Sequence, residues 1–123
     1  MVVAIVVVAA VLRRLRGSGP APVASAVVQI AAFKAALITF AEDTGHYPDK
    51  AKGLAQLLQQ PQGTTNWHGP YLDSDTIPKD PWGHDYIYEV PGRHNTNSFD
   101  LMSPGPDGRP GTKDDIANWT IKN

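Results

Sequence analysis

The sequence predicts an α+β fold in which helices come first and a small antiparallel sheet with long loops follows. Two observations carry this prediction. Apolar residues recur at helical spacing in the first third of the chain. After residue 84, short runs alternate between apolar and polar residues and are separated by turn-forming residues, as in a β-hairpin. At 123 residues, the chain is long enough for one domain with a small core.

A long amphipathic helix is predicted over residues 23–43. Its apolar residues recur at spacings of three, four and seven and are Val23, Val27, Ile30, Leu37 and Phe40, with Phe33 beside them. Gly45 is the expected C-cap, because glycine adopts a left-handed backbone without steric cost. A shorter helix is expected over residues 49–60, with Asp49 as its N-cap and Pro61 as its stop.

The first twelve residues carry no polar side chain, and three arginines follow between residues 13 and 16. As a helix this run spans about 18 Å, whereas the hydrocarbon core of a bilayer is about 30 Å thick, so it cannot cross a membrane alone. Its basic residues lie on the C-terminal flank, the wrong side for a signal peptide. We interpret the run as the distal part of a membrane helix. Residues 17–22 are expected to interrupt that helix, which divides the chain into 1–22 and a head domain, 23–123.

Two later segments are predicted to form an antiparallel pair of strands. Residues 85–90 (DYIYEV) and 98–102 (SFDLM) alternate in polarity and are rich in aromatic and β-branched residues. The segment between them is rich in turn-forming residues, which favours a hairpin. Residues 119–121 are expected to add a third short strand.

Charge is distributed unevenly along the chain. The net charge is -1, so there is no overall attraction to nucleic acid. Residues 1–40 carry four basic residues and no acid, whereas all 12 acids lie from residue 42 to residue 115. This asymmetry indicates a basic stem near a membrane and an acidic head. The chain has no cysteine, which excludes a disulfide framework and thiolate chemistry.

Residues 103–115 (SPGPDGRPGTKDD) carry the clearest chemical signal. Three carboxylates, those of Asp107, Asp114 and Asp115, stand in a loop rich in glycine and proline. Carboxylates together with backbone carbonyls are the ligands that calcium prefers, although the spacing is not that of an EF-hand. A solvated acidic surface loop is the alternative interpretation. A catalytic pair formed by Asp114 and Asp115 would lack a histidine or nucleophile nearby in the sequence.

The remaining polar and aromatic residues indicate no further site. The four histidines have no spacing that is typical of a metal site. Trp67, Trp82 and Trp119 stand in segments without a basic patch, which favours a role in the core over stacking on bases or sugars. We expect Trp82 and Tyr71 to be core residues.

Several motifs occur in one order along the chain. They are EDTGHYP at 42–48, WHGPYL at 67–72, IPKDPWGHDYIY at 77–88 and PGPDGRPGTKDDIANW at 104–119. This series resembles the major pseudopilins of type II secretion systems over residues 23–119. The family's leader, cleavage site and N-terminal glutamate have no counterpart here, and residues 1–8 resemble the middle of its membrane helix. We therefore expect that helix to begin upstream of Met1.

The resemblance implies a type IV pilin-like fold and a structural, non-enzymatic role. It implies a homopolymer, the pseudopilus, that works with other pseudopilins and inner-membrane secretion assembly proteins to drive protein export across the outer membrane. It implies a single-pass protein of the bacterial inner membrane with its head in the periplasm. It also implies a structural calcium ion bound by Asp107, Asp114 and Asp115, with backbone carbonyls near Pro104 and Arg109 completing the ligand set.

Two alternatives remain open at this point. One is a minor pseudopilin or a type IV pilin, although the absence of a cysteine pair argues against a type IV pilin. The other is a calcium-dependent module that binds a secreted substrate.

Overall fold

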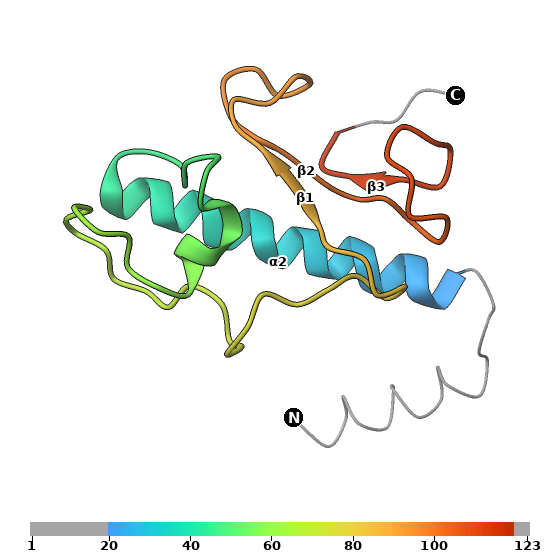
Figure 1. The fold of residues 1–123 in the computed structure, drawn as a ribbon, viewed down its shortest axis with the longest axis horizontal. Coiled ribbons are helices and arrows are strands. Elements are labelled where there is room, and N and C mark those ends of the chain that lie inside the picture. Colours follow the sequence, from blue (N-terminus) through green and yellow to red (C-terminus); the bar gives the residue numbers. More distant parts are fainter. Residues whose placement is uncertain (1–19, 120–123) are drawn as a thin grey trace.

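The structure, a computed structural model, describes residues 20–119 and combines one long helix with a small antiparallel sheet over this range (Figure 1). The elements are α2 (Pro20–Thr44), the 3-10 helix η1 (Gly53–Leu57), β1 (Ile87–Glu89), β2 (Asp100–Ser103) and β3 (Ile116–Ala117). The sheet lies on one side of α2, and η1 lies beside the C-terminal half of α2 (Figure 1). The predicted α+β order is confirmed. The apolar run at residues 1–12 lies outside the described residues.

Helix α2 begins and ends at residues that the sequence marks for these roles. It begins at Pro20, three residues before the predicted start. Pro20 and Pro22 lie in the first turn, where backbone N–H groups have no partner within the helix and the fixed φ of proline suits helical backbone. The interruption predicted at 17–22 therefore does not include residues 20–22. At the other end, the N–H of Gly45 donates to the Ala41 carbonyl at 2.8 Å, which confirms the predicted C-cap.

One face of α2 is buried. Its members repeat every three or four residues and are Ala26, Ile30, Phe33, Ala36, Leu37 and Phe40. The prediction is wrong for Val23 and Val27, whose exposed fractions are 38% and 52%. Val23 precedes Ala26, the first buried residue of the helix. Consecutive helical residues are rotated by about 100°, so Val27 lies beyond the edge of the face that contains Ala26.

The second predicted helix is shorter than expected. Only Gly53–Leu57 is helical, as a single stretch of 3-10 helix, whereas residues 49–60 were predicted. Asp49 accepts a hydrogen bond from the N–H of Lys52 at 2.9 Å, so it caps the turn before η1 and not the helix itself. Leu54 and Leu57 turn their side chains into the core.

The three strands form one sheet in the order β1-β2-β3, and both pairings are antiparallel. The pairing of β1 with β2 confirms the predicted hairpin. A third strand is present but lies earlier than predicted, because β3 is Ile116–Ala117 and pairs Ile116 with Ser103 at the end of β2. Of the predicted residues 119–121, Trp119 is not in a strand, and 120–121 lie outside the described residues. Trp119 instead stacks on the ring of His94, with the ring centroids 4.0 Å apart.

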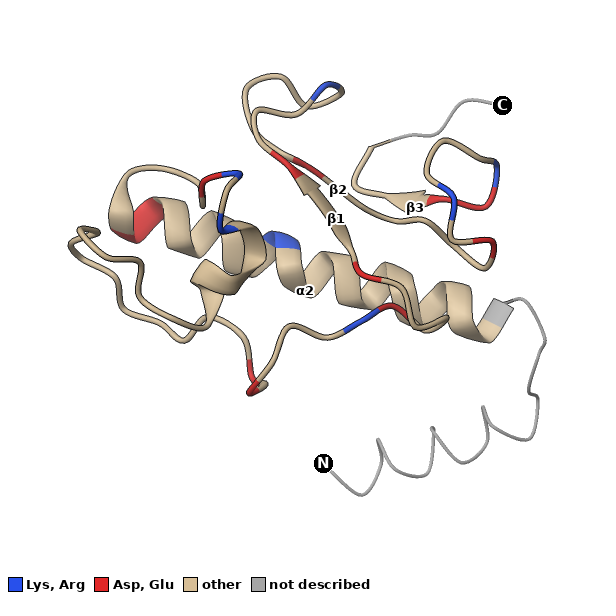
Figure 2. Cartoon of the chain, in the orientation of Figure 1, with Lys and Arg blue, Asp and Glu red and all other residues tan. Residues whose placement is uncertain are grey.

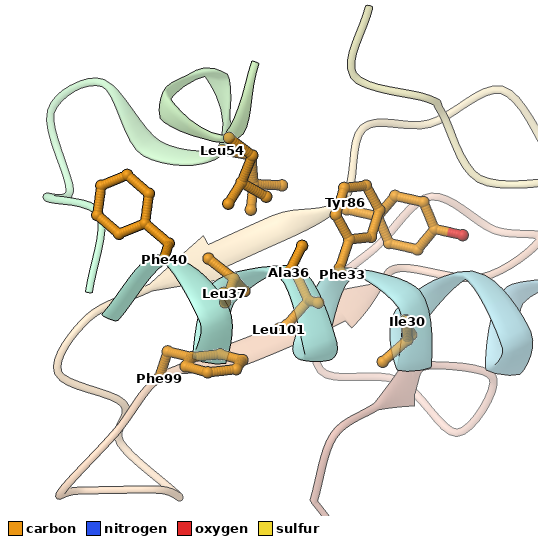
Figure 3. Packing of buried hydrophobic residues seen from close by; sticks show 10 residues of the cluster. Ile30, Phe33, Ala36, Leu37, Phe40, Leu54, Tyr86, Phe99 and Leu101 are labelled. Atoms are coloured by element: carbon orange, nitrogen blue, oxygen red, sulfur yellow. The ribbon is translucent and has the colours of Figure 1, made fainter. Parts of the chain in front are cut away.

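The core lies between the buried face of α2, η1 and β2 (Figure 3). Its buried members are Ile30, Phe33, Ala36, Leu37, Phe40, Leu54, Leu57, Tyr86, Phe99 and Leu101. Tyr71 packs against this cluster, as predicted, but remains partly exposed. Trp82 is also partly exposed and is not part of the cluster, so its prediction as a core residue is wrong. Hydrogen bonds from the backbone N–H groups of Trp82 and Gly83 to Asp80 close the turn that contains Trp82.

The turn between β1 and β2 is organised by a buried carboxylate, that of Asp100. The backbone N–H groups of Arg93, His94 and Asn95 donate to it at 2.8, 3.0 and 2.9 Å, and Nδ1 of His94 lies 3.0 Å away. Burial alone would raise the pKa of Asp100, but these hydrogen bonds outweigh burial and lower the pKa below its ordinary value of 3.8.

This lowered pKa predicts a loss of stability in acid. Because the folded-state pKa of Asp100 lies below 3.8, its contribution to the free energy of unfolding is complete well above pH 3.8. That contribution disappears as the pH falls from 3.8 toward the folded-state pKa. Asp100→Asn should cost about 2 kcal/mol at neutral pH, the strength of a hydrogen bond to a charged group. Urea unfolding across this pH range should show a shallower pH dependence in Asp100→Asn than in the parent, and parallel curves would contradict the assignment.

Candidate metal centre

Of the segment predicted to bind calcium, residues 103–115, Ser103 belongs to β2, and residues 104–115 form the loop that joins β2 to β3. Its base is closed by the pairing of Ser103 with Ile116, so the two ends of the loop lie one strand spacing apart. Pro104 and Gly105 are buried at the start of the loop, whereas Asp107 and Arg109 are exposed near its tip.

The two sides of the loop touch at Gly105. Its φ is +75°, and a Cβ atom placed there would lie 2.2 Å from the backbone carbonyl oxygen of Asp114. The N–H of Asp107 donates to Oδ2 of Asp114 at 3.1 Å. Only a residue without a side chain permits this approach, so Gly105 is what allows the second half of the loop to lie against the first.

Oxygen atoms gather around the hydroxyl of Thr112. It lies within hydrogen-bond reach of Oδ1 of Asp114, of Oδ1 of Asp115 at 3.3 Å and of the Arg109 carbonyl at 3.1 Å. A hydroxyl has one proton, so it can satisfy only one of these acceptors at a time. The result is a group of oxygen atoms of the kind that calcium binds, gathered around one hydroxyl.

The other predicted ligands are engaged differently. Oδ1 of Asp107 accepts from the N–H of Arg109 at 2.9 Å, and Oδ2 of Asp115 accepts from the N–H of Gly111 at 2.6 Å. Across residues 20–119, no three His, Cys, Asp or Glu side chains form a group that could hold a metal ion. The structure therefore brings together Asp114, Asp115 and the Arg109 carbonyl around Thr112, and Asp107 meets Asp114 through its backbone N–H.

Thr112 was not among the predicted site residues. The available signal was a hydroxyl side chain two residues before the first of the two adjacent aspartates, a position that can bond to both carboxylates. The Thr112 hydroxyl is also the main reason that the pKa of Asp114 is lowered from its ordinary value.

Comparison with known proteins identifies the chain. The family described as "Type II secretion system (T2SS), protein G" matches residues 13–119. The chain belongs to this family. It is 41% identical over 101 residues to the type II secretion system core protein G of Escherichia coli strain K12, a match that covers 78% of the chain and 66% of that protein. It is 41% identical over 118 residues to the same protein of Xanthomonas campestris pv. campestris, which covers 90% of the chain and 77% of that protein.

A solved structure supports the assignment of the chain to the protein G family. The crystal structure of the major pseudopilin from the type 2 secretion system of enterohaemorrhagic Escherichia coli is similar to the chain with a TM-score of 0.66 and 33% identity. The likeness covers 82% of the chain and 89% of that structure. The resemblance predicted from the sequence motifs and the pilin-like α+β fold are both confirmed.

Membership in the protein G family also decides the class of function. The family consists of structural pseudopilin subunits, so the chain is not an enzyme. The chain spans 66% of the length of the Escherichia coli relative, slightly less than two thirds. Helix α2 contains a segment, Ala21–Thr44, that could cross a membrane by length and composition alone, although one face of this helix is buried against the sheet and η1.

Proposed function

We propose that the chain is a membrane-anchored subunit that polymerises into the pseudopilus of the type II secretion system, supports protein export and holds one structural calcium ion. Its partners would be further copies of itself, other pseudopilins and inner-membrane assembly proteins. The membrane anchor would be the stem that contains residues 1–12, with the head in the periplasm.

The single observation that supports polymerisation is the exposed face of α2. This face bears four large apolar side chains with exposed fractions of 38–68%, namely Val23, Val27, Val28 and Ile38. Alanines at positions 24, 31, 32 and 35 lie between them and are exposed as well. Lys34 is the only charged residue of α2 before Glu42, so most of the helix carries no charge (Figure 2).

A surface of this kind favours a second copy of the same chain as its occupant. Extended apolar patches on soluble surfaces mark interaction sites. Small residues such as alanine let two helices approach closely. The patch runs along α2 from Val23 to Ile38 and begins next to the stem that would lead to the membrane, so copies side by side could align their stems and their α2 helices together.

A charge on this face is expected to prevent polymerisation without unfolding the head. Val28 is 68% exposed, so Val28→Asp should leave the melting temperature nearly unchanged. In a packed interface, an unpaired carboxylate costs roughly 3 kcal/mol or more, which should reduce the assembled fraction more than about tenfold. Filaments would be counted by electron microscopy after production in cells that contain the other secretion components. The matched control is Ala51→Asp, which places the same charge at an exposed position outside α2. Equal filament numbers for the two variants would contradict the proposal.

The calcium ion is supported by the oxygen atoms around Thr112. Asp114, Asp115 and the Arg109 carbonyl already face this point, and Asp107 and the Pro104 carbonyl belong to the same loop. The ion would neutralise like charges and order a loop that contains little apolar material. When bound, it would hold the loop against the head.

Calcium is expected to raise the stability of the chain by mass action. At a hundredfold excess over the dissociation constant, the gain is about 2.7 kcal/mol. Magnesium should substitute poorly, because it is smaller and demands octahedral geometry. Melting curves with calcium, magnesium and chelator would be compared for the parent, for Asp114→Ala and for Asp73→Ala, which removes an exposed carboxylate outside the loop. The calcium effect should vanish only in Asp114→Ala. Identical melting of the parent in calcium and in chelator would leave the solvated-loop interpretation.

A further inference from the structure

The turn at residues 80–84, which precedes β1, contains a buried carboxylate without an obvious purpose. Asp80 is only 4% exposed, and no salt bridge reaches it within the part of the chain that the structure describes. Burying a charge is costly unless hydrogen bonds compensate for it. Oδ1 of Asp80 accepts from the N–H groups of Trp82 at 3.0 Å and His84 at 2.7 Å. Two backbone hydrogen bonds, from Asp80 N–H to the His84 carbonyl and from Gly83 N–H to the Asp80 carbonyl, close the turn on itself.

The other oxygen of Asp80 points out of its own turn, toward the base of the candidate calcium loop. Oδ2 accepts from the hydroxyl of Ser103, a fully buried residue at the end of β2, at 2.6 Å. Because the Ser103 proton is directed at a carboxylate, a lone pair of Oγ is free to accept the N–H of Gly105, at 3.0 Å. Gly105 is the residue that lies against the Asp114 carbonyl. A continuous series of contacts thus connects Asp80 to a predicted calcium ligand.

A second contact connects the same turn to the tip of the loop. A Cβ atom built on Gly108 would lie 2.8 Å from Cε1 of His84, so the imidazole ring rests on the backbone at Gly108. Gly108 stands between Asp107 and Arg109, two further predicted ligands. The turn therefore reaches the loop at two positions, indirectly at Gly105 through the Ser103 hydroxyl and directly at Gly108 through the His84 ring.

We infer that the turn at residues 80–84 holds the 104–115 loop close to its calcium-binding shape, and that Asp80 is a positioning residue for the ion without being a ligand. This inference rests on the calcium site of the proposed function. A loop that is already held near its bound geometry loses less conformational entropy when the ion binds. Residues outside the ligand set that orient the ligands typically change metal affinity by 10- to 100-fold when they are replaced.

Three variants test whether the turn at residues 80–84 affects calcium affinity and not only the stability of the fold. Asp80→Asn keeps the size of the side chain but removes the charge that directs the Ser103 proton. Ser103→Ala keeps the hydrogen bonds within the turn and removes both contacts of the Ser103 hydroxyl, the one to Asp80 and the one to Gly105. Asp100→Asn is the matched control, because Asp100 is also a buried carboxylate that holds a turn, but that turn lies between β1 and β2.

The experiment uses the full chain in non-ionic detergent and two readouts. Calcium titration by calorimetry should show affinity about tenfold weaker in Asp80→Asn and Ser103→Ala and unchanged in Asp100→Asn. Amide hydrogen exchange in chelator should be faster at residues 105–115 in the first two variants only. If Asp80→Asn does not fold, Ser103→Ala provides both readouts. Calcium affinity and exchange equal to those of the parent would overturn the inference. A parent that binds no calcium would instead refute the proposed site, and exchange without the ion would still decide whether the turn supports the loop.

Discussion

Replacing Phe33 with alanine is expected to lower the free energy of unfolding by about 3–5 kcal/mol. The Phe33 side chain is 1% exposed and lies at the centre of the core, edge-to-face with Tyr86 at a centroid distance of 5.0 Å (Figure 3). Its removal leaves a cavity between α2 and Tyr86. The Tyr86 ring cannot easily move to fill this cavity, because its hydroxyl donates a hydrogen bond to Gln29 of α2. Small domains have only about 5–15 kcal/mol of stability, so this loss is a large share of the total.

A matched substitution on the same helix tests whether burial is the cause. Ile38→Ala removes a large apolar side chain from the exposed face, where the fraction exposed is 38%. It should cost well under half as much as Phe33→Ala, because water already reaches the side chain. Urea unfolding of both variants would give the two free energies. Equal losses would mean that the face of α2 that contains Phe33 is not the one packed in the core.

Replacing Gly105 with alanine is the second large expected effect. The positive φ of +75° costs any L-residue about 1–2 kcal/mol. The new Cβ would also meet the Asp114 carbonyl oxygen at 2.2 Å. Because this neighbour is backbone, the loop must shift, which adds about 1–3 kcal/mol. The shift would also separate Asp114 from the first half of the loop, so calcium-dependent stabilisation should be lost along with intrinsic stability.

Gly111 provides the control within the same loop. It has a φ of +89°, but a Cβ there would meet no atom within 4 Å. Gly111→Ala should therefore show only the conformational cost. Melting curves in calcium and in chelator would separate the two contributions. Equal destabilisation by the two variants would show that the loop is not closed at Gly105.

Much of the fold followed from local patterns. The helix around residues 23–43 was predictable because its apolar side chains recur at the helical period, and the period alone decides which side chains share a face. The hairpin was predictable because residues 85–90 and 98–102 alternate and a turn-rich segment joins them. The choice of Asp114 and Asp115 as candidate ligands also came from local composition, since carboxylates in a glycine-rich loop are typical of calcium sites.

Other features depended on contacts between distant residues. The position of β3 was missed because two residues form the strand only by pairing with the end of β2, and no pattern within residues 116–117 specifies that pairing. Val23 and Val27 were placed in the core because the pattern continues to the start of the helix. How much of the helix is covered depends on the extent of the sheet and η1, which the helical period does not encode.

By itself, the sequence determined the class of fold, most of the buried face of α2 and the family, and it marked the last loop as a candidate cation site. The tertiary structure alone decided which turn supports that loop. Asp80 and Ser103 are separated by 23 positions and meet only because β2 ends beside the turn at residues 80–84. A buried hydrogen bond between distant residues leaves no periodic trace in the sequence, since its two partners are brought together by the packing of the elements that carry them.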